Sequence, residues 1–326
     1  MKKAIVVSNP NSGARRRRPG PAAITRRLEE AGFGVRHLRA SSSSDVQGTL
    51  REALRDESPD ETRVIAVGGD GTINAVLPAL AGTEFPLCIV PSGTLNALAG
   101  ELGIPRGLRE AMTVALEGQA HRIDLGLANG RPFAQMAGAG FDGAVVHTVV
   151  PPANKNMLGC SALSRGARLL TSYTATRCRV TTETTAVEGD AWLALVANAR
   201  HYTYHLRVAP QAAADDGWLD VWLFESVPAA QVARQVYGLL RGRPSSCPGV
   251  RHLRARQARL ESDPPVFVHV DGDQAGQTPV DISVAPAALT VMIPSAEAAR
   301  RLASRRSTPL PGGRSSLRFP APHPAR

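Results

Sequence analysis

Apolar and polar positions in the first third of the chain follow two alternating periods. Short apolar runs of the strand type are separated by longer segments whose apolar residues recur at helical spacing. The predicted strands are Lys3–Val7, Gly34–Leu38, Val64–Val67 and Pro86–Val90. The predicted helices are Ala22–Ala31, a segment from Ser44 or Asp45 to about Arg55, and Ile73–Leu80. Strands separated by helices of this length predict a parallel sheet with right-handed crossovers.

The pattern changes at about Ile123, where short β-type runs are divided by Gly, Pro and Asp turns. These runs are Phe133–Met136, Arg177–Thr182, Trp192–Ala197, Leu219–Phe224, Val266–Val270 and Leu289–Ile293. Only Ser161–Leu170 and Ala229–Leu240 are predicted as helices in this part. We therefore expect an α/β domain over residues 1–124, a mainly β domain over 125–294, and a disordered tail over 307–326.

Composition sets outer limits on the class of protein. At 43% hydrophobic residues the chain can build sizeable cores, and no apolar run approaches the ~20 residues that cross a bilayer. The first apolar run, Ala4–Val7, is shorter than that of a signal peptide, so a cytoplasmic location is expected. The four cysteines lie far apart without metal-ligand spacing, which predicts buried or idle thiols: Cys88, Cys160, Cys178 and Cys247.

The net charge of +10 comes from clustered arginines. They form the run Arg15–Arg18, a dispersed set, and a tail in which every charged residue after Glu297 is arginine. The dispersed set is Arg241, Arg243, Arg251, Arg254, Arg256 and Arg259. Such patches attract anionic membranes or nucleic acid, and solvated surface explains them equally well. Because aromatic residues are not interleaved with the arginines, we expect no nucleic-acid partner.

The sequence Gly68-Gly69-Asp70-Gly71-Thr72 follows the apolar run Val64–Val67 and precedes a predicted helix. Glycines let backbone N–H groups approach a bulky anion, and Asp70 places a carboxylate within reach of a divalent metal. Thr72 is predicted to cap the helix that follows. Strand, turn, acid and helix N-terminus together predict a phosphate site.

Two further polar loops follow predicted strands. They are Asn9-Pro10-Asn11-Ser12-Gly13 and Pro91-Ser92-Gly93-Thr94-Leu95-Asn96. Each alone is an ordinary polar turn. Because ligands sit at the carboxyl ends of parallel strands, we expect these loops and the Gly68–Thr72 turn to share one edge of the sheet.

The second domain adds acids at strand ends. Alternation along residues 266–271 places Asp271 and His269 on the face opposite the valines, so Asp271 could take a proton from a hydroxyl. A simple Asp-Gly turn is the competing interpretation, and a lone histidine such as His269 is more often structural. The segment Asp215–Asp220 is either a turn or a set of oxygen ligands for Mg²⁺.

Taken in order, these motifs resemble the diacylglycerol kinase catalytic family, which includes bacterial YegS-like lipid kinases and the sphingosine kinases. The motifs are NPNSG, GGDGT, PSGTLNALAGELGIP, AGAGFDG, DDGWLD and VDGD. The resemblance spans about residues 3–294. The GGDGT motif alone also resembles NAD kinases and 6-phosphofructokinases, whereas PSGTLNALA and VDGD favour the lipid kinases.

The resemblance implies an α/β + β architecture: an N-terminal NAD kinase/phosphofructokinase-like α/β nucleotide-binding domain and a C-terminal β-sandwich-like domain that carries the lipid surface. The chain would return to the first domain near residues 295–306. ATP would lie along Asn9–Gly13, Ser41, Gly68–Asn74 and Thr94.

The resemblance also implies roles for single residues. Asp271 would be the general base, and Asp273 stands where the family has Glu in its D-G-E motif. Asp216 and the carbonyl of Trp218 would hold a structural Mg²⁺, while Asp70 would hold Mg²⁺ on the phosphates, directly or through water. Asn96 and Asp124 would support these groups. ATP and Mg²⁺ are therefore the expected cofactors.

Departures from the family pattern keep alternatives open. Ala97 and Ala75 replace acids found in many members, and His201–His205 replaces a glycine-rich turn. A kinase for NAD or a sugar phosphate, and a non-catalytic nucleotide- or lipid-binding regulator, stay as alternatives. The expected partners are a lipid substrate and the anionic face of a membrane, with a homodimer left open through an exposed sheet edge.

Overall fold

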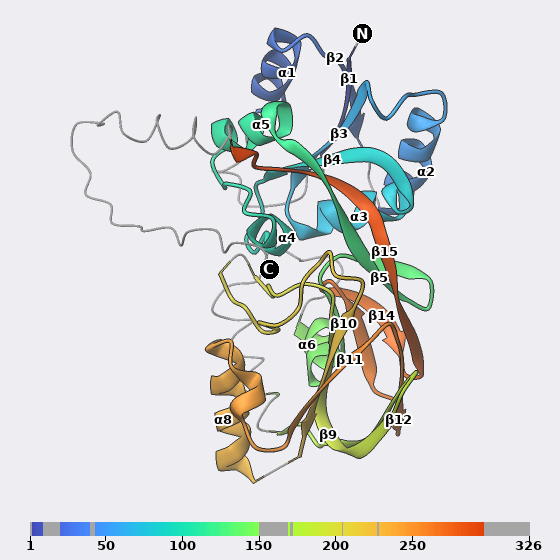
Figure 1. Ribbon diagram of the computed structural model, residues 1–326, viewed down its shortest axis with the longest axis vertical. Coiled ribbons are helices and arrows are strands. Elements are labelled where there is room, and N and C mark those ends of the chain that lie inside the picture. Colours follow the sequence, from blue (N-terminus) through green and yellow to red (C-terminus); the bar gives the residue numbers. More distant parts are fainter. Residues whose placement is uncertain are drawn as a thin grey trace, which may run out of the picture.

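The computed structural model describes residues 2–8, 20–39, 43–149, 169, 172–203, 205–226 and 228–296. These residues form two lobes that follow one another along the long axis of the molecule (Figure 1). Several predictions lie outside the described residues. They are the loop Asn9–Gly13, Ser41, the run Arg15–Arg18, Cys160, most of the helix Ser161–Leu170 and the tail.

The first lobe is a parallel sheet with helices on its faces, as the alternating pattern predicts. Its strands are β1 (Lys3–Ser8), β2 (Gly34–Arg39), β3 (Thr62–Gly68) and β4 (Thr83–Pro91), in the order β2-β1-β3-β4. Its helices are α1 (Pro21–Glu30), α2 (Ser43–Leu54), α3 (Asp70–Leu80), α4 (Ala97–Glu101) and α5 (Leu108–Glu117). All three strand pairs are parallel, so the strands end at one edge of the sheet.

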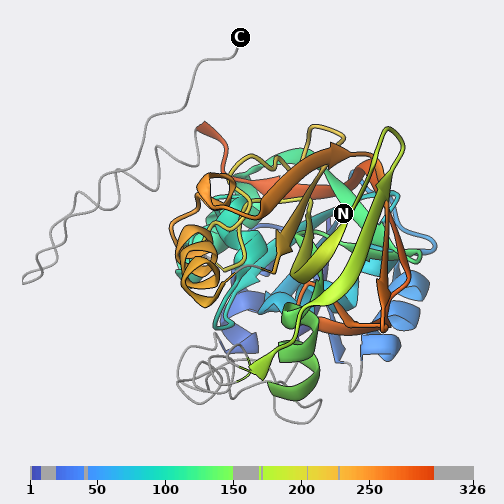
Figure 2. The ribbon, with the colours of Figure 1, turned by 90° about the horizontal axis from the view of Figure 1, so that it is seen from below.

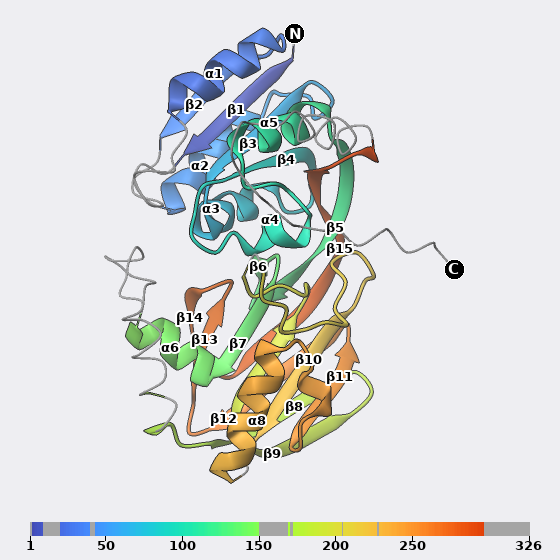
Figure 3. The same cartoon turned by 90° about the vertical axis from the view of Figure 1, so that its left-hand side faces the viewer.

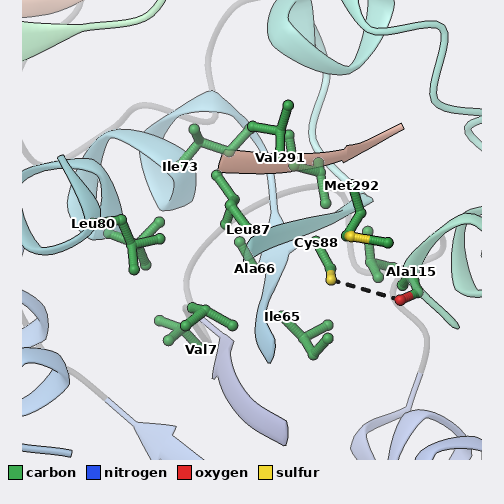
Figure 4. Close-up of a cluster of buried hydrophobic side chains, with 14 of the residues drawn as sticks. Val7, Ile65, Ala66, Ile73, Leu80, Leu87, Cys88, Ala115, Val291 and Met292 are labelled. Atoms are coloured by element: carbon green, nitrogen blue, oxygen red, sulfur yellow. Dashed lines mark hydrogen bonds between the residues drawn. The ribbon is translucent and has the colours of Figure 1, made fainter. Parts of the chain in front are cut away.

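The core of the first lobe lies between this sheet and its helices. Ile65 and Leu87 from neighbouring strands are fully buried together with Ile73 of α3 (Figure 4). Cys88 belongs to the same cluster, and its Sγ lies 3.7 Å from the carbonyl oxygen of Ala115. Cys88 therefore acts as a small apolar side chain, as its isolated position in the sequence predicts.

The second lobe is mainly antiparallel β-structure (Figure 2). Its strands are β6 (Arg131–Phe133), β7 (Met136–Gly140), β8 (Thr176–Thr182), β9 (Ala186–Ala197), β10 (Leu219–Glu225), β11 (Val250–Ala255), β12 (Gln257–Asp263), β13 (Phe267–Val270) and β14 (Asp273–Gln277). Its helical elements are α6 (Phe141–Val149), α8 (Ala229–Leu240) and η3 (Pro244–Ser246). No helix among the described residues has the length and apolar character to cross a bilayer.

Helix α6 corrects the sequence analysis, which expected only Ser161–Leu170 and Ala229–Leu240 to be helical in the second domain. It begins within the AGAGFDG motif. Gly143 on this helix packs against strand β13, where an added Cβ would lie 2.0 Å from the carbonyl oxygen of Phe267. Glycine lets the helix approach the strand closely, and the low helix propensity of glycine hides that helix in the sequence.

Two long strands join the lobes, β5 (Gln119–Ala128) and β15 (Val280–Ile293). They pair antiparallel with each other along most of their length, and β15 also runs parallel to β4, where Val291 pairs with Leu87. Their register shifts between Ala285 and Leu289, where Ala287 has φ +49°. The chain therefore returns to the first lobe within β15, before the expected segment 295–306, of which only 295 and 296 are described.

Candidate active site

The two glycine-containing loops of the first lobe touch each other through their backbones. A Cβ built on Gly93 would lie 2.4 Å from Cα of Gly69, so neither position has room for a side chain. The backbone N–H of Ser92 donates to the carbonyl oxygen of Gly68 over 2.8 Å. The ends of β3 and β4 thereby bring two predicted motifs into one surface.

The turn after β3 differs from the prediction in one respect. Helix α3 begins at Asp70, with Gly69 at the N-cap and no side chain capping it. Thr72 is therefore not the cap; its side chain is buried, and an added Cβ at Gly68 would collide with it at 2.0 Å. No side chain caps α3. The N–H groups of Thr72 and Ile73 donate to the Gly69 carbonyl oxygen (2.9 and 3.3 Å), so an anion would meet the positive end of the helix dipole and the N–H groups before them.

The loop after β4 is closed by Asn96, which adopts the left-handed conformation at φ +48°. Its Oδ1 accepts the N–H of Gly93 (3.0 Å) and its Nδ2 donates to the Gly93 carbonyl oxygen (2.8 Å). The N–H of Ala97 donates to Asp70 Oδ1 over 2.8 Å, so position 97 supports Asp70 through its backbone. Thr94 is exposed, and its carbonyl oxygen accepts a hydrogen bond from Arg106.

Asp271 lies in the turn between β13 and β14, with φ +48°. Its carboxylate accepts three successive backbone N–H groups, from Ala134 (2.8 Å), Gln135 (3.1 Å) and Met136 (2.8 Å). Ala134 and Gln135 lie between β6 and β7, and Met136 begins β7, so the strand that the sequence predicts over Phe133–Met136 is interrupted here. Three donors fix the orientation of the carboxylate and favour its ionised form.

One side chain connects this turn to the first lobe. Asn74, one turn into α3, donates through Nδ2 to the carbonyl oxygen of Asp271 (3.0 Å) and to Asp273 Oδ2 (3.1 Å). Arg131 also contacts Asp273 Oδ2, at 3.2 Å. Helix α3 and the β13–β14 hairpin thus meet where the lobes join (Figure 3), although 197 positions separate Asn74 from Asp271.

Asp70 and Asp271 are called the junction acids below. Burial raises the pKa of Asp271 to about 6 against the lowering effect of its three N–H donors, and the charge of Asp70 contributes to the rise. Burial also raises the pKa of Asp70, which the N–H groups of Ala97 and Asn96 oppose. Buried carboxylates whose pKa values are raised favour the binding of a cation or the uptake of a proton.

A buried pair of side chains that the sequence pattern did not indicate adjoins the Asp271 turn. His269 Nε2 lies 2.6 Å from Asp142 Oδ2, and Tyr202 donates its hydroxyl to Asp142 Oδ1 over 2.8 Å. A Cβ at Gly138 would lie 2.3 Å from His269 Nε2, so the glycine in AGAGFDG leaves room for this hydrogen bond. The glycines of this motif were the one signal in the sequence that another group packs closely here.

In the Asp142–His269 pair, each side chain shifts the pKa of the other. Burial alone would lower the pKa of His269, but the carboxylate of Asp142, with smaller contributions from Asp271 and Asp273, holds this pKa above its usual value. Burial alone would raise the pKa of Asp142, and His269 and the Tyr202 hydroxyl outweigh it, so this pKa is lowered. The second ring nitrogen of His269, Nδ1, accepts the N–H of Gly272 over 3.3 Å, so the pair is connected directly to the Asp271 turn.

The segment that departs from the family pattern, His201–His205, takes part in this arrangement. Tyr202 reaches Asp142, and His201 Nδ1 lies 2.6 Å from Glu101 Oε2 at the end of α4. The side chains of His201 and Glu101 are almost entirely buried, at 7% and 6% exposed. The segment therefore contacts both lobes beside the junction acids.

A second group of acids, Asp124, Asp216 and Asp220, lies near the strands that join the lobes; we call them the hinge acids. Asp124 is buried on β5 and accepts the N–H groups of Gly217 (2.6 Å) and Ala287 (2.7 Å). Asp124 thus fixes the shifted register of β15, a supporting role at the junction of the lobes.

Two of the hinge acids, Asp216 and Asp220, already have cationic partners in the chain. Asp216 accepts the N–H of Trp218 (3.0 Å) on one oxygen and an Arg254 N–H on the other. Buried Asp220 binds His252 through Oδ1, while its Oδ2 has no hydrogen bond and faces Arg254 Nε at 4.0 Å. Arg254 occupies the position that a cation would take beside Asp216, so Asp216 does not fit the expected structural Mg²⁺, and the Trp218 carbonyl as a ligand stays a prediction. Within the described ranges no cluster of three or more His, Cys, Asp or Glu side chains is arranged to hold a metal ion.

The chain is similar to known proteins along both lobes. Residues 3–128 match the model of the diacylglycerol kinase catalytic domain, and residues 136–293 match that of the YegS C-terminal NAD kinase beta sandwich-like domain. The match to the second model confirms the expected β-sandwich-like class of the second lobe.

Individual relatives agree with these matches. The chain is 28% identical over 283 residues to a diacylglycerol kinase of Bacillus subtilis, covering 86% of this chain and 92% of the relative. It is 29% identical over 301 residues to a diacylglycerol kinase of Mycobacterium tuberculosis, covering 90% and 95%. A crystal structure of a diacylglycerol kinase from Bacillus anthracis superposes with a TM-score of 0.67 at 21% identity, covering 90% of this chain and 98% of that one. This protein belongs to the diacylglycerol kinase catalytic-domain family, and it is an enzyme of the kinase class.

Proposed function

We propose that this kinase transfers the γ-phosphate of ATP to the hydroxyl group of a diacylglycerol-like lipid, with Asp271 as the general base. The names of the curated relatives support the choice of a lipid acceptor. The observation that carries the proposal is the contact of Asn74 with the Asp271 turn, because it joins the helix that begins in the GGDGT motif of one lobe to the VDGD motif of the other.

The phosphates of ATP would lie against the first lobe. The glycine turn at Gly68–Gly69 and the uncapped start of α3 offer backbone N–H groups and the positive end of a helix dipole to an anion. The Gly93 loop packs against this turn and holds its shape. Phosphoryl transfer depends mostly on such positioning and on charge stabilisation.

The proton of the acceptor hydroxyl would go to Asp271. With a pKa of about 6, the carboxylate is ionised at neutral pH and is a stronger base than an ordinary aspartate. As the hydroxyl oxygen bonds to the γ-phosphorus, the O–H proton passes to Asp271 and the bond to the β–γ bridging oxygen breaks, which releases ADP. The three N–H donors keep the carboxylate in one orientation during this transfer.

Asp70 fits the role of holding Mg²⁺ on the phosphates, directly or through water. Its carboxylate has a raised pKa and no cationic side chain among the described residues as a hydrogen-bond or ion-pair partner. When bound, Mg²⁺ would neutralise charge on the phosphate oxygens.

The test is ATP turnover by the purified chain across a panel of acceptors. The panel contains diacylglycerol and sphingosine in mixed micelles, NAD⁺ and a sugar phosphate, with ADP and phosphorylated product both measured. We expect turnover with a lipid only, and a loss of about 10³-fold in kcat for Asp271→Asn. The ATP dissociation constant of this variant should stay within about twofold of the parent, because Asp271 acts on the acceptor.

Asp60→Asn, an exposed acid of the first lobe, is the matched control and should keep full turnover. An Asp271→Asn variant as active as the parent would remove Asp271 from the mechanism. Phosphorylation of NAD⁺ or a sugar phosphate without lipid would instead support a kinase for soluble acceptors.

A further inference from the structure

Helix α8 is attached to the second lobe by one face only (Figure 1). Val232, Val236 and Leu239 pack on the cluster that contains the buried residue Trp192. Gln235 is completely buried: its Oε1 accepts the Trp192 indole N–H over 2.6 Å, and its Nε2 donates to the carbonyl oxygen of Pro248 over 2.8 Å. The packing and hydrogen bonds of this inner face are enough to hold the helix on the second lobe.

The outer face of α8 is apolar as well. Tyr237 and Leu240 are 61% and 59% exposed, and no other large hydrophobic side chain of the described residues is exposed to a comparable extent. Ala230 and Ala233 are exposed at helical spacing before them, so the four residues form one stripe. A helix that is apolar on its solvent face as well as its buried face indicates a surface that is covered in use.

The charge around this stripe has one sign. Between Glu225 and Glu261 the sequence contains seven arginines and no acid. Four of the arginines have partners: Arg251 with Glu225, Arg254 with Asp216, Arg256 over the Trp218 ring, and Arg259 with Asp281.

The remaining three arginines are Arg234, Arg241 and Arg243, on α8 and directly after it. All three are exposed, and the described residues give none of them an ion pair with an acid. The Arg241 guanidinium lies 5.6 Å from the centre of the Tyr237 ring, so charge and apolar stripe adjoin. The outer face of α8 thus combines two exposed large hydrophobic side chains with three arginines.

We propose that the outer face of α8 docks on the surface of an anionic lipid bilayer. The arginines would meet the headgroups, and Tyr237 and Leu240 would enter the boundary between headgroups and acyl chains, as in interfacial amphipathic helices. A second copy of this chain fits less well, because a symmetric contact would bring six arginines together with no acid from this segment between them. This inference rests on the proposed function in one respect: a kinase that phosphorylates a lipid has to reach a bilayer.

The experiment measures binding of the full chain to vesicles of phosphatidylcholine with and without phosphatidylglycerol, by co-sedimentation at low and high salt. The triple variant Arg234→Gln/Arg241→Gln/Arg243→Gln should bind anionic vesicles about 100-fold more weakly at low salt, which corresponds to about 3 kcal/mol. This difference should disappear at high salt. Tyr237→Ser/Leu240→Ser should weaken binding about 10-fold at both salt concentrations.

The matched control removes the same charge from exposed arginines of the first lobe, as Arg36→Gln/Arg55→Gln/Arg109→Gln. It should retain the vesicle affinity of the parent, which shows that local and not total charge matters. Thermal unfolding confirms that each variant is folded. Asp271→Asn should bind vesicles like the parent, so loss of catalysis and loss of docking are separate results.

Unchanged vesicle binding in both α8 variants would overturn the proposal. So would a dimer in analytical ultracentrifugation that Tyr237→Ser/Leu240→Ser dissociates, because the stripe would then be covered by a second copy. A parent that binds anionic vesicles through α8 but phosphorylates no lipid would contradict the proposed function and leave the docking face in place.

Discussion

The junction acids and the hinge acids are both close to the meeting point of the lobes, and their surroundings differ in kind. Asp70 and Asp271 accept hydrogen bonds from backbone N–H groups, whereas Asp216 and Asp220 face Arg254. A carboxylate that pairs with an arginine of the same chain has its charge compensated within the protein. A carboxylate held only by neutral donors keeps its charge for a substrate, a metal ion or a proton, and this is what a phosphoryl-transfer site requires.

The hinge acids are not all alike in their pKa. Burial raises the pKa of Asp216 as well, while Arg254 lowers it. The contrast between the two groups therefore lies in their partners more than in burial. It can be tested by removing, in turn, the support of a junction acid and the partner of a hinge acid.

The largest effect after that of Asp271→Asn is expected from the pair behind Asp271. His269→Asn and Asp142→Asn should each lower kcat by about 30-fold, because both break the hydrogen-bonded pair that holds the turn of the proposed general base through Gly272. A changed position of this turn alters the surroundings of Asp271, so the acid limb of the pH–rate profile should move. Tyr202→Phe removes only the outer hydrogen bond and should cost about threefold.

Steady-state kinetics across pH, with unfolding temperatures as a control for folding, separate these possibilities. A merely structural role would reduce the amount of folded enzyme and leave the acid limb in place. Unchanged profiles in all three variants would show that the pair does not act on Asp271.

The pH dependence of the parent provides a smaller test. A general base works in its deprotonated form, and the pKa of Asp271 is raised to about 6. We therefore expect kcat to be constant above this pH and to fall about tenfold per pH unit below it. A rate that stays flat down to pH 4.5 in a folded protein would mean that Asp271 has the pKa of an ordinary aspartate or is not the base.

The hinge acids should respond in stability rather than in rate. Arg254→Ala removes the partner of Asp216 and leaves buried Asp220 Oδ2 without a facing cation, so it should lower the free energy of unfolding by about 1–2 kcal/mol. Turnover should stay within about threefold of the parent. Arg177→Ala, which breaks only exposed ion pairs, is the control and should unfold like the parent.

The Arg254→Ala variant also tests whether a structural Mg²⁺ can bind at Asp216. Mg²⁺ without nucleotide should leave the unfolding temperature of the parent unchanged, because Arg254 occupies the site, and should raise that of Arg254→Ala. A parent that Mg²⁺ stabilises through Asp216 would show that the arginine yields to the ion.

The sequence predicted the parts of the fold and site that are local. The strand before Gly68 and the loop at Pro91–Asn96 are found where the pattern placed them, because a β-branched run ending in glycine has few alternatives. The cap was wrong because Gly69 takes the N-cap and Thr72 points into the core.

The parts of the site that could not be predicted depend on residues far apart in the sequence or on backbone groups. The N–H donors of Ala134, Gln135 and Met136 belong to the backbone, which has no sequence signature. The pairing of Asp142 with His269 spans 127 positions, and only the packing of the lobes brings the two together. The position of Arg254 opposite Asp216 depends on the register of β10 and β11 in the same way.

The ribbon of β5 and β15 has a mechanical consequence. It continues from one lobe into the other, and its register shift at Ala285–Leu289 is fixed by the bond from Ala287 to Asp124. Paired strands resist sliding past each other far more than bending, so opening and closing of the enzyme should be a flexion about this irregularity. We expect amide hydrogen exchange to be faster at residues 285–289 than in the paired residues on either side. Uniform protection along β5 and β15 would mean that the two strands do not bend, and that only side chains and loops move when substrate enters.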